Sequence, residues 1–405
     1  MRRLALAALL ATAAPVLAQS DLPPEPLVEQ VLELYPGTLA ADADVAAARA
    51  EGRALATGAH EVTLTGTVSR RSVENDRRFA EYDGTLSRAF RLPGKARLDR
   101  QAGALGVEIA QNLAEDARHQ AALTLAQLWY DWVRAGEQHR NAEALVANQD
   151  AAAAAVRRRV ALRDAAPLDL EQALSAVAAA RVQVADALAE RERARALLAG
   201  TFAELALPAE PPRPATPAEP AEGLDQLRDW AVERSHDITA AARTADQKAV
   251  LASRARLDRI ADPSVGVRVF SERGGEEQGA GLYASIPFGG GHRRALADQA
   301  SAQASAATAQ SSLTRRKVEA EAAADLAETR ARLSAWAASR EAVARAEASA
   351  RLSARGQDLG EIDLADRLYA ERQANDARRL EIEARVNADL AILKLRIDAH
   401  SLWIH

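Results

Sequence analysis

Residues 164–170 read DAAPLDL, and much later in the chain residues 358–364 read DLGEIDL. Each of these short segments is predicted to end one very long helix and to precede a shorter one. The match extends upstream, because Asp131 corresponds to Asp325 and the segment 94–97 corresponds to 291–294. Two large copies of one unit, unlike the many short units of a solenoid, predict pseudo-symmetry within one closed assembly.

The duplication also predicts how the chain is divided. We expect a first repeat over residues 19–206, a proline-rich linker over 207–223 and a second repeat over 224–405. Each repeat should contain a short helix, a pair of strands, a very long helix, a sharp break and a shorter helix. The prolines of the linker exclude a helix and favour an extended crossover.

The beginning of the chain resembles a secretory signal. A basic start at residues 1–3, an apolar run at 4–14 and small residues ending at Ala18 predict a signal peptide over residues 1–18 and a mature chain outside the cytoplasm. The sequence contains no cysteine, which excludes thiolate metal ligands and a lipid anchor on an N-terminal cysteine. The formal net charge of -5 is spread over a mixed surface and indicates no nucleic-acid partner.

Two exceptionally long helices are predicted. Residues 95–163 and 292–355 contain no proline, are rich in alanine and repeat apolar residues at helical spacing. A helix of about 70 residues is roughly 100 Å long, which exceeds what a compact domain can bury. The following segments carry a heptad-like apolar seam, so each long helix and its return should form a helical hairpin.

Four segments alternate like strands, at residues 61–70, 82–92, 262–271 and 279–288. Strands of about ten residues suit a tilted crossing of an outer membrane. Four strands cannot close a barrel in lipid, and an open edge would leave backbone groups unpaired in hydrocarbon. Several chains are therefore expected to share one barrel.

Three motifs in this order resemble the TolC-like outer-membrane efflux proteins over essentially the whole mature chain. They are LWYDWVR at 128–134, ASIPFGGGHRR at 284–294 and GEIDLADRL at 360–368. The resemblance implies a mainly α fold with two β-hairpins. It implies a homotrimer with a 12-stranded β-barrel in the outer membrane of a Gram-negative bacterium, continued by a long α-helical barrel through the periplasm.

The resemblance also implies a function without catalysis. The chain would be the outer-membrane exit duct of a tripartite efflux system, passively conducting drugs or metal ions supplied by a periplasmic adaptor and an inner-membrane exporter. An alternative is the outer channel of a type I protein secretion system, and a weaker one is a periplasmic coiled-coil adaptor or structural protein. The missing anchor cysteine and the short chain depart from many family members.

Candidate site residues lie at the second hairpin tip and at a strand-to-helix junction. The resemblance places Asp366 on the family's tip acid, where three copies would form a carboxylate ring that repels anions and holds cations. Asp363, on the same helical face, is a second gate candidate or a helix cap. Arg355 and Arg367 are candidate latches that hold the tips closed through ion pairs.

Other residue groups receive structural interpretations. Pro287, Gly289, Gly290 and Gly291 predict a bend from strand to helix, because no P-loop order follows the glycines. The aromatic residues of segment 129–132 are expected to be packing anchors. The seven histidines show no ligand spacing and are expected to be scattered over the surface, so no metal and no cofactor is predicted.

Overall fold

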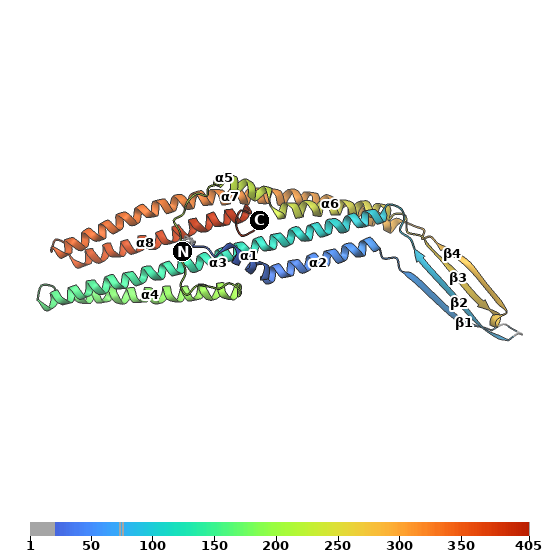
Figure 1. Ribbon diagram of the computed structural model, residues 1–405, viewed down its shortest axis with the longest axis horizontal. Coiled ribbons are helices and arrows are strands. Elements are labelled where there is room, and N and C mark those ends of the chain that lie inside the picture. Colours follow the sequence, from blue (N-terminus) through green and yellow to red (C-terminus); the bar gives the residue numbers. More distant parts are fainter. Residues whose placement is uncertain (1–20, 73, 75–76, 405) are drawn as a thin grey trace, which may run out of the picture. The chain divides into compact units, whose positions relative to one another are not determined.

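The computed structural model describes residues 21–404 except 73, 75 and 76, so the signal peptide predicted over residues 1–18 lies outside the described residues. Helices make up most of the chain, and four strands lie side by side in one sheet (Figure 1). The first half contains α1 (Glu25–Leu34), α2 (Pro36–Thr57), β1 (Val62–Ser72), β2 (Arg78–Ala89), α3 (Lys95–Ala161) and α4 (Pro167–Thr201). The second half contains α5 (Leu224–Glu233), α6 (His236–Leu257), β3 (Ser264–Glu272), a 3-10 turn (Arg273–Gly275), β4 (Glu277–Ser285), α7 (Gly291–Asp358) and α8 (Leu364–Asp398).

The two halves repeat the same order of elements, with closely matched lengths. The long helices α3 and α7 have 67 and 68 residues, and α4 and α8 have 35 each. The residues at which α4 and α8 begin show which tip residues of the two repeats correspond, and they correct the alignment made from the sequence. Asp169 and Asp366 are both the third residue of their helix, whereas the sequence match had aligned Asp169 with Asp363. Apolar residues spaced three or four apart give nearly equal matches when a helix is shifted by that amount, which explains the error.

The chain divides into two compact units, and the division between them does not coincide with the predicted linker. The first unit comprises the chain up to Val31, Leu125–Pro220 and Thr329–Leu393, and the second comprises Leu32–Thr124, Ala221–Glu328 and Lys394–His405. Each unit therefore takes segments from both repeats. Residues 207–223, the predicted linker, contain neither helix nor strand, as their prolines require. The repeat boundaries themselves stay a prediction.

The sheet is antiparallel in the order β1-β2-β3-β4, so the two hairpins are joined through β2 and β3. One face, which we call the apolar face, carries most of the exposed aliphatic side chains. They are Val62, Leu64, Val68, Leu86, Val265, Val267, Val269 and Leu282. The opposite face, called the polar face, carries Thr63, Thr65, Thr67, Asp83 and Arg268. The alternation predicted from the sequence is therefore present in the structure.

The ends of the strands differ from the predictions. The fourth segment was expected to remain extended to residue 288, but β4 ends at Ser285 and residues 286–290 are irregular. Pro287 lacks the N–H that a ladder requires, and Gly289 has a φ of 96°, so the strand cannot continue through them. β2 begins at Arg78, earlier than predicted, and ends at Ala89.

In the first unit a small apolar core lies near the hairpin tips. Its buried members are Ala153, Val156, Ala173, Val177 and Leu364, with Val160, Leu170, Leu174 and Leu368 packed around them. These residues come from α3, α4 and α8, so the first helical hairpin packs directly against the returning helix of the second. The heptad seam of α4 is less complete than predicted, because Leu188 remains 38% exposed.

In the second unit α2 approaches α3 closely at a pair of glycines. A methyl group on Gly103 would come within 2.8 Å of Gly52 Cα, which is backbone and cannot rotate away. A methyl group on Gly106, one turn further along α3, would meet only the flexible side-chain amide of Gln247 at 2.9 Å. The contact between the two helices therefore depends on the absence of a side chain at Gly103.

We predict that Gly103→Ala destabilises the protein and that Gly106→Ala does not. Overpacking costs typically 1–3 kcal/mol, which outweighs the gain of about 1 kcal/mol from replacing glycine in a helix. Thermal unfolding of the purified protein in detergent, followed by circular dichroism, should show a lower midpoint for Gly103→Ala and an equal or higher one for Gly106→Ala. Equal midpoints for the two variants would contradict the close approach.

Candidate functional site

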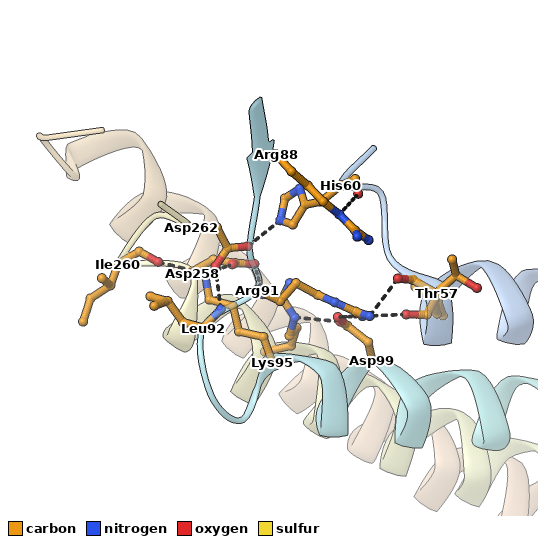
Figure 2. Close-up of polar contacts among 12 residues, drawn as sticks. Thr57, His60, Arg88, Arg91, Leu92, Lys95, Asp99, Asp258, Ile260 and Asp262 are labelled. Carbon is orange, nitrogen blue, oxygen red and sulfur yellow. Dashed lines mark hydrogen bonds and ion pairs between the residues drawn. The ribbon is translucent and has the colours of Figure 1, made fainter. Parts of the chain in front are cut away.

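A buried lysine lies at the junction between β2 and α3. Lys95 is the first residue of α3, and its side chain is only 1% exposed. Its ammonium group donates to Asp262 Oδ1 at 2.7 Å and to the carbonyl of Ile260 at 2.8 Å, and it forms an ion pair with Asp258 Oδ1 at 2.8 Å (Figure 2). Each of the three ammonium hydrogens therefore has an acceptor. All three acceptors lie in the short segment between α6 and β3.

Asp262 connects this lysine to the other strands. Its Oδ1 also accepts from the backbone N–H of Leu92 at 3.0 Å, and its Oδ2 lies 2.8 Å from Nε2 of His60. Burial acts to raise the pKa of Asp262, but the bonds from Lys95, His60 and Leu92 outweigh it and lower the pKa to about 2. The carboxylate is therefore charged at neutral pH and holds the entry of β3 against the exit of β2.

Arg91 closes the end of α2 in the same region. Its guanidinium donates to the carbonyls of residues 55, 56 and 57 at 2.7–2.9 Å, and it also bonds Asp99 Oδ2 at 2.9 Å (Figure 2). Carbonyls at a helix C-terminus lack intrahelical donors and carry partial negative charge, so a guanidinium is a suitable cap. Asp99 also accepts from Arg254 Nε at 2.6 Å, which connects α3 to α6.

The second strand-to-helix junction, between β4 and α7, is built without a buried charge. By the match of the two repeats, Phe288 and His292 stand where the first repeat has Arg91 and Lys95, and both are exposed, Phe288 at 93%. The bend there depends on Gly289, with its positive φ, and on the helix start at Gly291, where Arg294 N–H donates to the carbonyl of Gly290 at 2.8 Å. Gly94, with a φ of 92°, makes the comparable turn before α3. Sequence reasoning singled out the glycines but not Lys95, Asp262 or Arg91.

The two hairpin tips use their acids differently. At the first tip Asp169 accepts from the backbone N–H of Ala166 at 3.0 Å and so caps the start of α4. At the second tip Asp363 precedes α8, and its Oδ1 accepts from the backbone N–H of Asp366 at 2.8 Å. Asp363 thus takes the role of N-cap. The carboxylate of Asp366, at the same helical position as Asp169, is exposed to solvent.

The candidate latch Arg367 is engaged inside its own hairpin. Its guanidinium donates to Glu371 Oε1 at 2.8 Å and to Gln357 Oε1 at 3.0 Å. Glu371 in turn accepts from Gln149 of α3 at 2.9 Å. Arg355 is exposed, and within the described residues no ion pair joins either arginine to Asp363 or Asp366. The structure therefore brings Arg367 to Glu371 rather than to the two candidate gate acids.

The aromatic segment of α3 holds the start of the described chain. Trp129 Nε1 donates to the carbonyl of Asp21 at 2.8 Å, and Tyr130 Oη donates to Asp21 Oδ2 at 3.1 Å. The same carboxylate accepts from the linker N–H of Ala215 at 3.1 Å. Trp132 is completely buried beside Trp129, with ring centroids 5.5 Å apart. These aromatic side chains anchor both the N-terminal segment and the linker to α3.

Three of the histidines are clustered, which corrects the expectation that all are scattered. In the second unit the ring of His400 lies 5.7 Å from that of His119 and 4.8 Å from that of His236. Burial acts to lower the pKa of His119, but bonds to Asp116 and Asp398 raise it to about 9, whereas burial and the neighbouring cations lower the pKa of His400 to about 4. Within the described residues no group of three potential ligands is arranged to hold a metal ion.

None of the helices in the described residues has a stretch sufficiently long and apolar to cross a lipid bilayer. No protein-family model and no curated protein matches the sequence.

Solved structures, in contrast, match nearly the whole chain. A membrane protein from Pseudomonas aeruginosa is 20% identical with a TM-score of 0.79, over 92% of this chain and 89% of that chain. The outer membrane protein VceC from Vibrio cholerae is 19% identical with a TM-score of 0.76, over 92% and 95%. The outer-membrane channel OprN is 22% identical with a TM-score of 0.78, over 93% and 90%.

The fold is that of an outer-membrane channel protomer. More particularly, the chain has the fold of the TolC-like outer-membrane channels, as the sequence motifs indicated. The predicted mainly α fold with two β-hairpins is confirmed.

We predict that Lys95→Met destabilises the protein strongly. Removing one partner of a buried ion pair leaves uncompensated charge, here on Asp262 and Asp258, at a cost of about 3–5 kcal/mol. Thermal unfolding in detergent should show a large fall in midpoint, and Lys317→Met, which changes an exposed lysine of α7, is the control.

Acid provides a second check on this prediction. The pKa of Asp262 is lowered in the folded state. Its contribution to the stability of the fold is therefore present above about pH 4 and is lost as the pH falls towards 2. The difference in unfolding midpoint between wild type and Lys95→Met should therefore become smaller in strong acid. A difference that does not change with pH would show that the lysine acts through packing alone.

Proposed function

We propose that the chain is one protomer of an outer-membrane exit duct of a tripartite efflux system in a Gram-negative bacterium. Three copies would form one barrel in the outer membrane and one helical tunnel in the periplasm. Small solutes such as drugs or metal ions would pass from an inner-membrane exporter and a periplasmic adaptor to the exterior. The duct would conduct passively, without making or breaking bonds.

The observation that carries this proposal is the apolar face of the sheet. Leu64 and Val68 are each 75% exposed and Leu282 is 94% exposed, so none of the described segments covers this face. A contiguous exposed apolar surface marks an interaction with lipid or protein. On the polar face the guanidinium of Arg268 pairs with Asp83 near mid-strand. Charges on one side and bare aliphatic groups on the other are the arrangement of a membrane barrel wall.

The free edges of the sheet support a shared barrel. Within the described residues β1 pairs only with β2, and β4 pairs only with β3. An unpaired strand edge cannot remain in hydrocarbon, because each unsatisfied backbone group costs several kcal/mol. Strands of other copies are the partners that leave both edges paired without adding a second kind of protein.

The difference between the tips supports Asp366 as the gate acid. Asp169 of the first tip is occupied in capping α4, whereas Asp363 performs that task for α8 and leaves the Asp366 carboxylate in solvent. Three such carboxylates around a threefold axis would favour cations. We propose Asp366 as the gate residue, with Asp363 positioning it through the helix start. Arg355, which is exposed, is the better latch candidate than Arg367.

We predict that Leu64→Asp impairs membrane insertion and that its neighbour Thr65→Asp does not. The two residues are adjacent in β1 but lie on the apolar and the polar face respectively. An acid on a lipid-facing position costs about 1–3 kcal/mol in each protomer, less near the interfaces. Insertion into lipid vesicles and heat-modifiable trimer bands on gels measure the effect. Equal insertion of both variants would rule out a membrane-facing apolar face.

We predict that Asp366→Asn lowers the cation preference of the duct, because it removes three negative charges from one ring. Reversal potentials in planar bilayers under a salt gradient measure this preference. Asp164→Asn is the matched control, since Asp164 is a first-tip acid paired with Arg159 at 3.0 Å. An unchanged reversal potential in Asp366→Asn would remove this residue from the gate.

The latch assignment is tested in the same recordings. Arg355→Ala should raise conductance if Arg355 holds the tips closed between copies, and high salt should reproduce part of that rise by screening the ion pairs. Arg367→Ala is expected to loosen the tip of its own hairpin through loss of the Glu371 contact. Conductance identical to wild type in Arg355→Ala would exclude the latch.

A further inference from the structure

The arginines near the outer end of the first β-hairpin are divided between the two faces of the sheet. Arg71 lies on the polar face and forms ion pairs with Glu81 at 2.9 Å and with Glu272 at 3.2 Å. Arg77, just before β2, pairs with Glu276. Arg70 and Arg78 lie on the apolar face and are exposed.

Within the four strands, the apolar face carries no acid to balance these two arginines. The acids of the four strands, Glu81, Asp83, Glu272 and Glu277, all alternate onto the polar face. In the described residues neither Arg70 nor Arg78 forms an ion pair. The pairing of residue 70 with Ala80 and of Ser72 with residue 78 makes the two arginines diagonal neighbours on adjacent strands. Diagonal Cβ atoms in such a pair are about 7–8 Å apart, so both guanidinium groups can reach one anion.

Their position along the strands identifies the kind of anion. The apolar band of this face ends at the pair Val68 and Tyr82, exposed at 75% and 56%. Aromatic residues commonly mark the boundary between hydrocarbon and headgroups in membrane barrels. Arg70 and Arg78 come next, on the side of the hairpin turn. The proposed membrane position of the apolar face therefore puts Arg70 and Arg78 at headgroup height, on the same face as the aliphatic residues.

We propose that Arg70 and Arg78 form a clamp for the phosphate groups of the glycolipid in the outer leaflet. This inference rests on the proposed function, which places the apolar face in the membrane and the hairpin turns outside the cell. Guanidinium groups bind phosphate oxygens in a planar, bidentate manner. Two neighbouring cations repel each other, and a bound phosphate relieves that repulsion. With three copies, the clamp occurs three times around the barrel.

The test is binding of bisphosphorylated lipid A to the purified trimer in mild detergent, measured by native mass spectrometry. Each arginine near a charged membrane surface contributes roughly a fivefold factor in affinity. The double variant Arg70→Gln/Arg78→Gln should therefore bind lipid A roughly 25-fold more weakly. Arg71→Gln, at the same height on the polar face, is the control and should bind like wild type. Dephosphorylated lipid A should bind weakly to wild type and variants alike.

Three results would overturn the clamp: unchanged lipid A binding in the double variant, equal loss in Arg71→Gln, or equal binding of dephosphorylated lipid A. Each variant is first tested for heat-modifiable trimers and conductance in phosphatidylcholine bilayers, and the single variants replace the double one if it fails to assemble. A wild-type protein that never inserts would refute the duct and the clamp together. Normal conductance without preference for phosphorylated lipid would refute the clamp alone.

Discussion

The ammonium group of Lys95 holds together the junction where α6 leads into β3 and β2 leads into α3. Moving a bare cation into the interior costs several kcal/mol, so it can remain there only if its acceptors are fixed in place. Those acceptors lie between α6 and β3 in the second half of the chain, whereas α3 belongs to the first half. The start of α3, the end of α6 and the entry of β3 are thereby held at fixed separations. The central pairing of β2 with β3 follows, because Asp262 also holds the backbone of Leu92 where β2 leads into α3.

The sequence predicted those features that depend on local pattern. The helix α3 was expected over residues 95–163 and covers Lys95–Ala161, because alanine content and the absence of proline act along the chain itself. Strand alternation likewise separated Leu64 from Thr65 before any pairing was known. Exact register at the hairpin tips was not available from the pattern, since a shift of about one helical turn leaves the apolar spacing nearly unchanged.

Features that depend on distant pairing could not be predicted. Lys95 and Asp262 are 167 positions apart, and His119 and Asp398 are 279 apart. In a list of charged residues on a mixed surface, nothing distinguishes these from their exposed neighbours. The role of Asp363 was equally open, because an aspartate that caps a helix and an aspartate that lines a pore look the same in the sequence. The capping role is shown only by the structure, in which the backbone N–H of Asp366 donates to the carboxylate of Asp363 at 2.8 Å.

The unequal capping of the two tips has an evolutionary meaning. When a gene duplicates in tandem, both copies of a motif begin with the same obligations, and either can be altered only if something else meets them. At the first tip Asp169 still serves its own helix, so its replacement would be felt in folding. At the second tip Asp363 caps the helix, so the side chain of the equivalent residue, Asp366, takes no part in that capping bond. The chain therefore has one tip whose acid is committed to its own helix and another whose corresponding acid has no such structural duty.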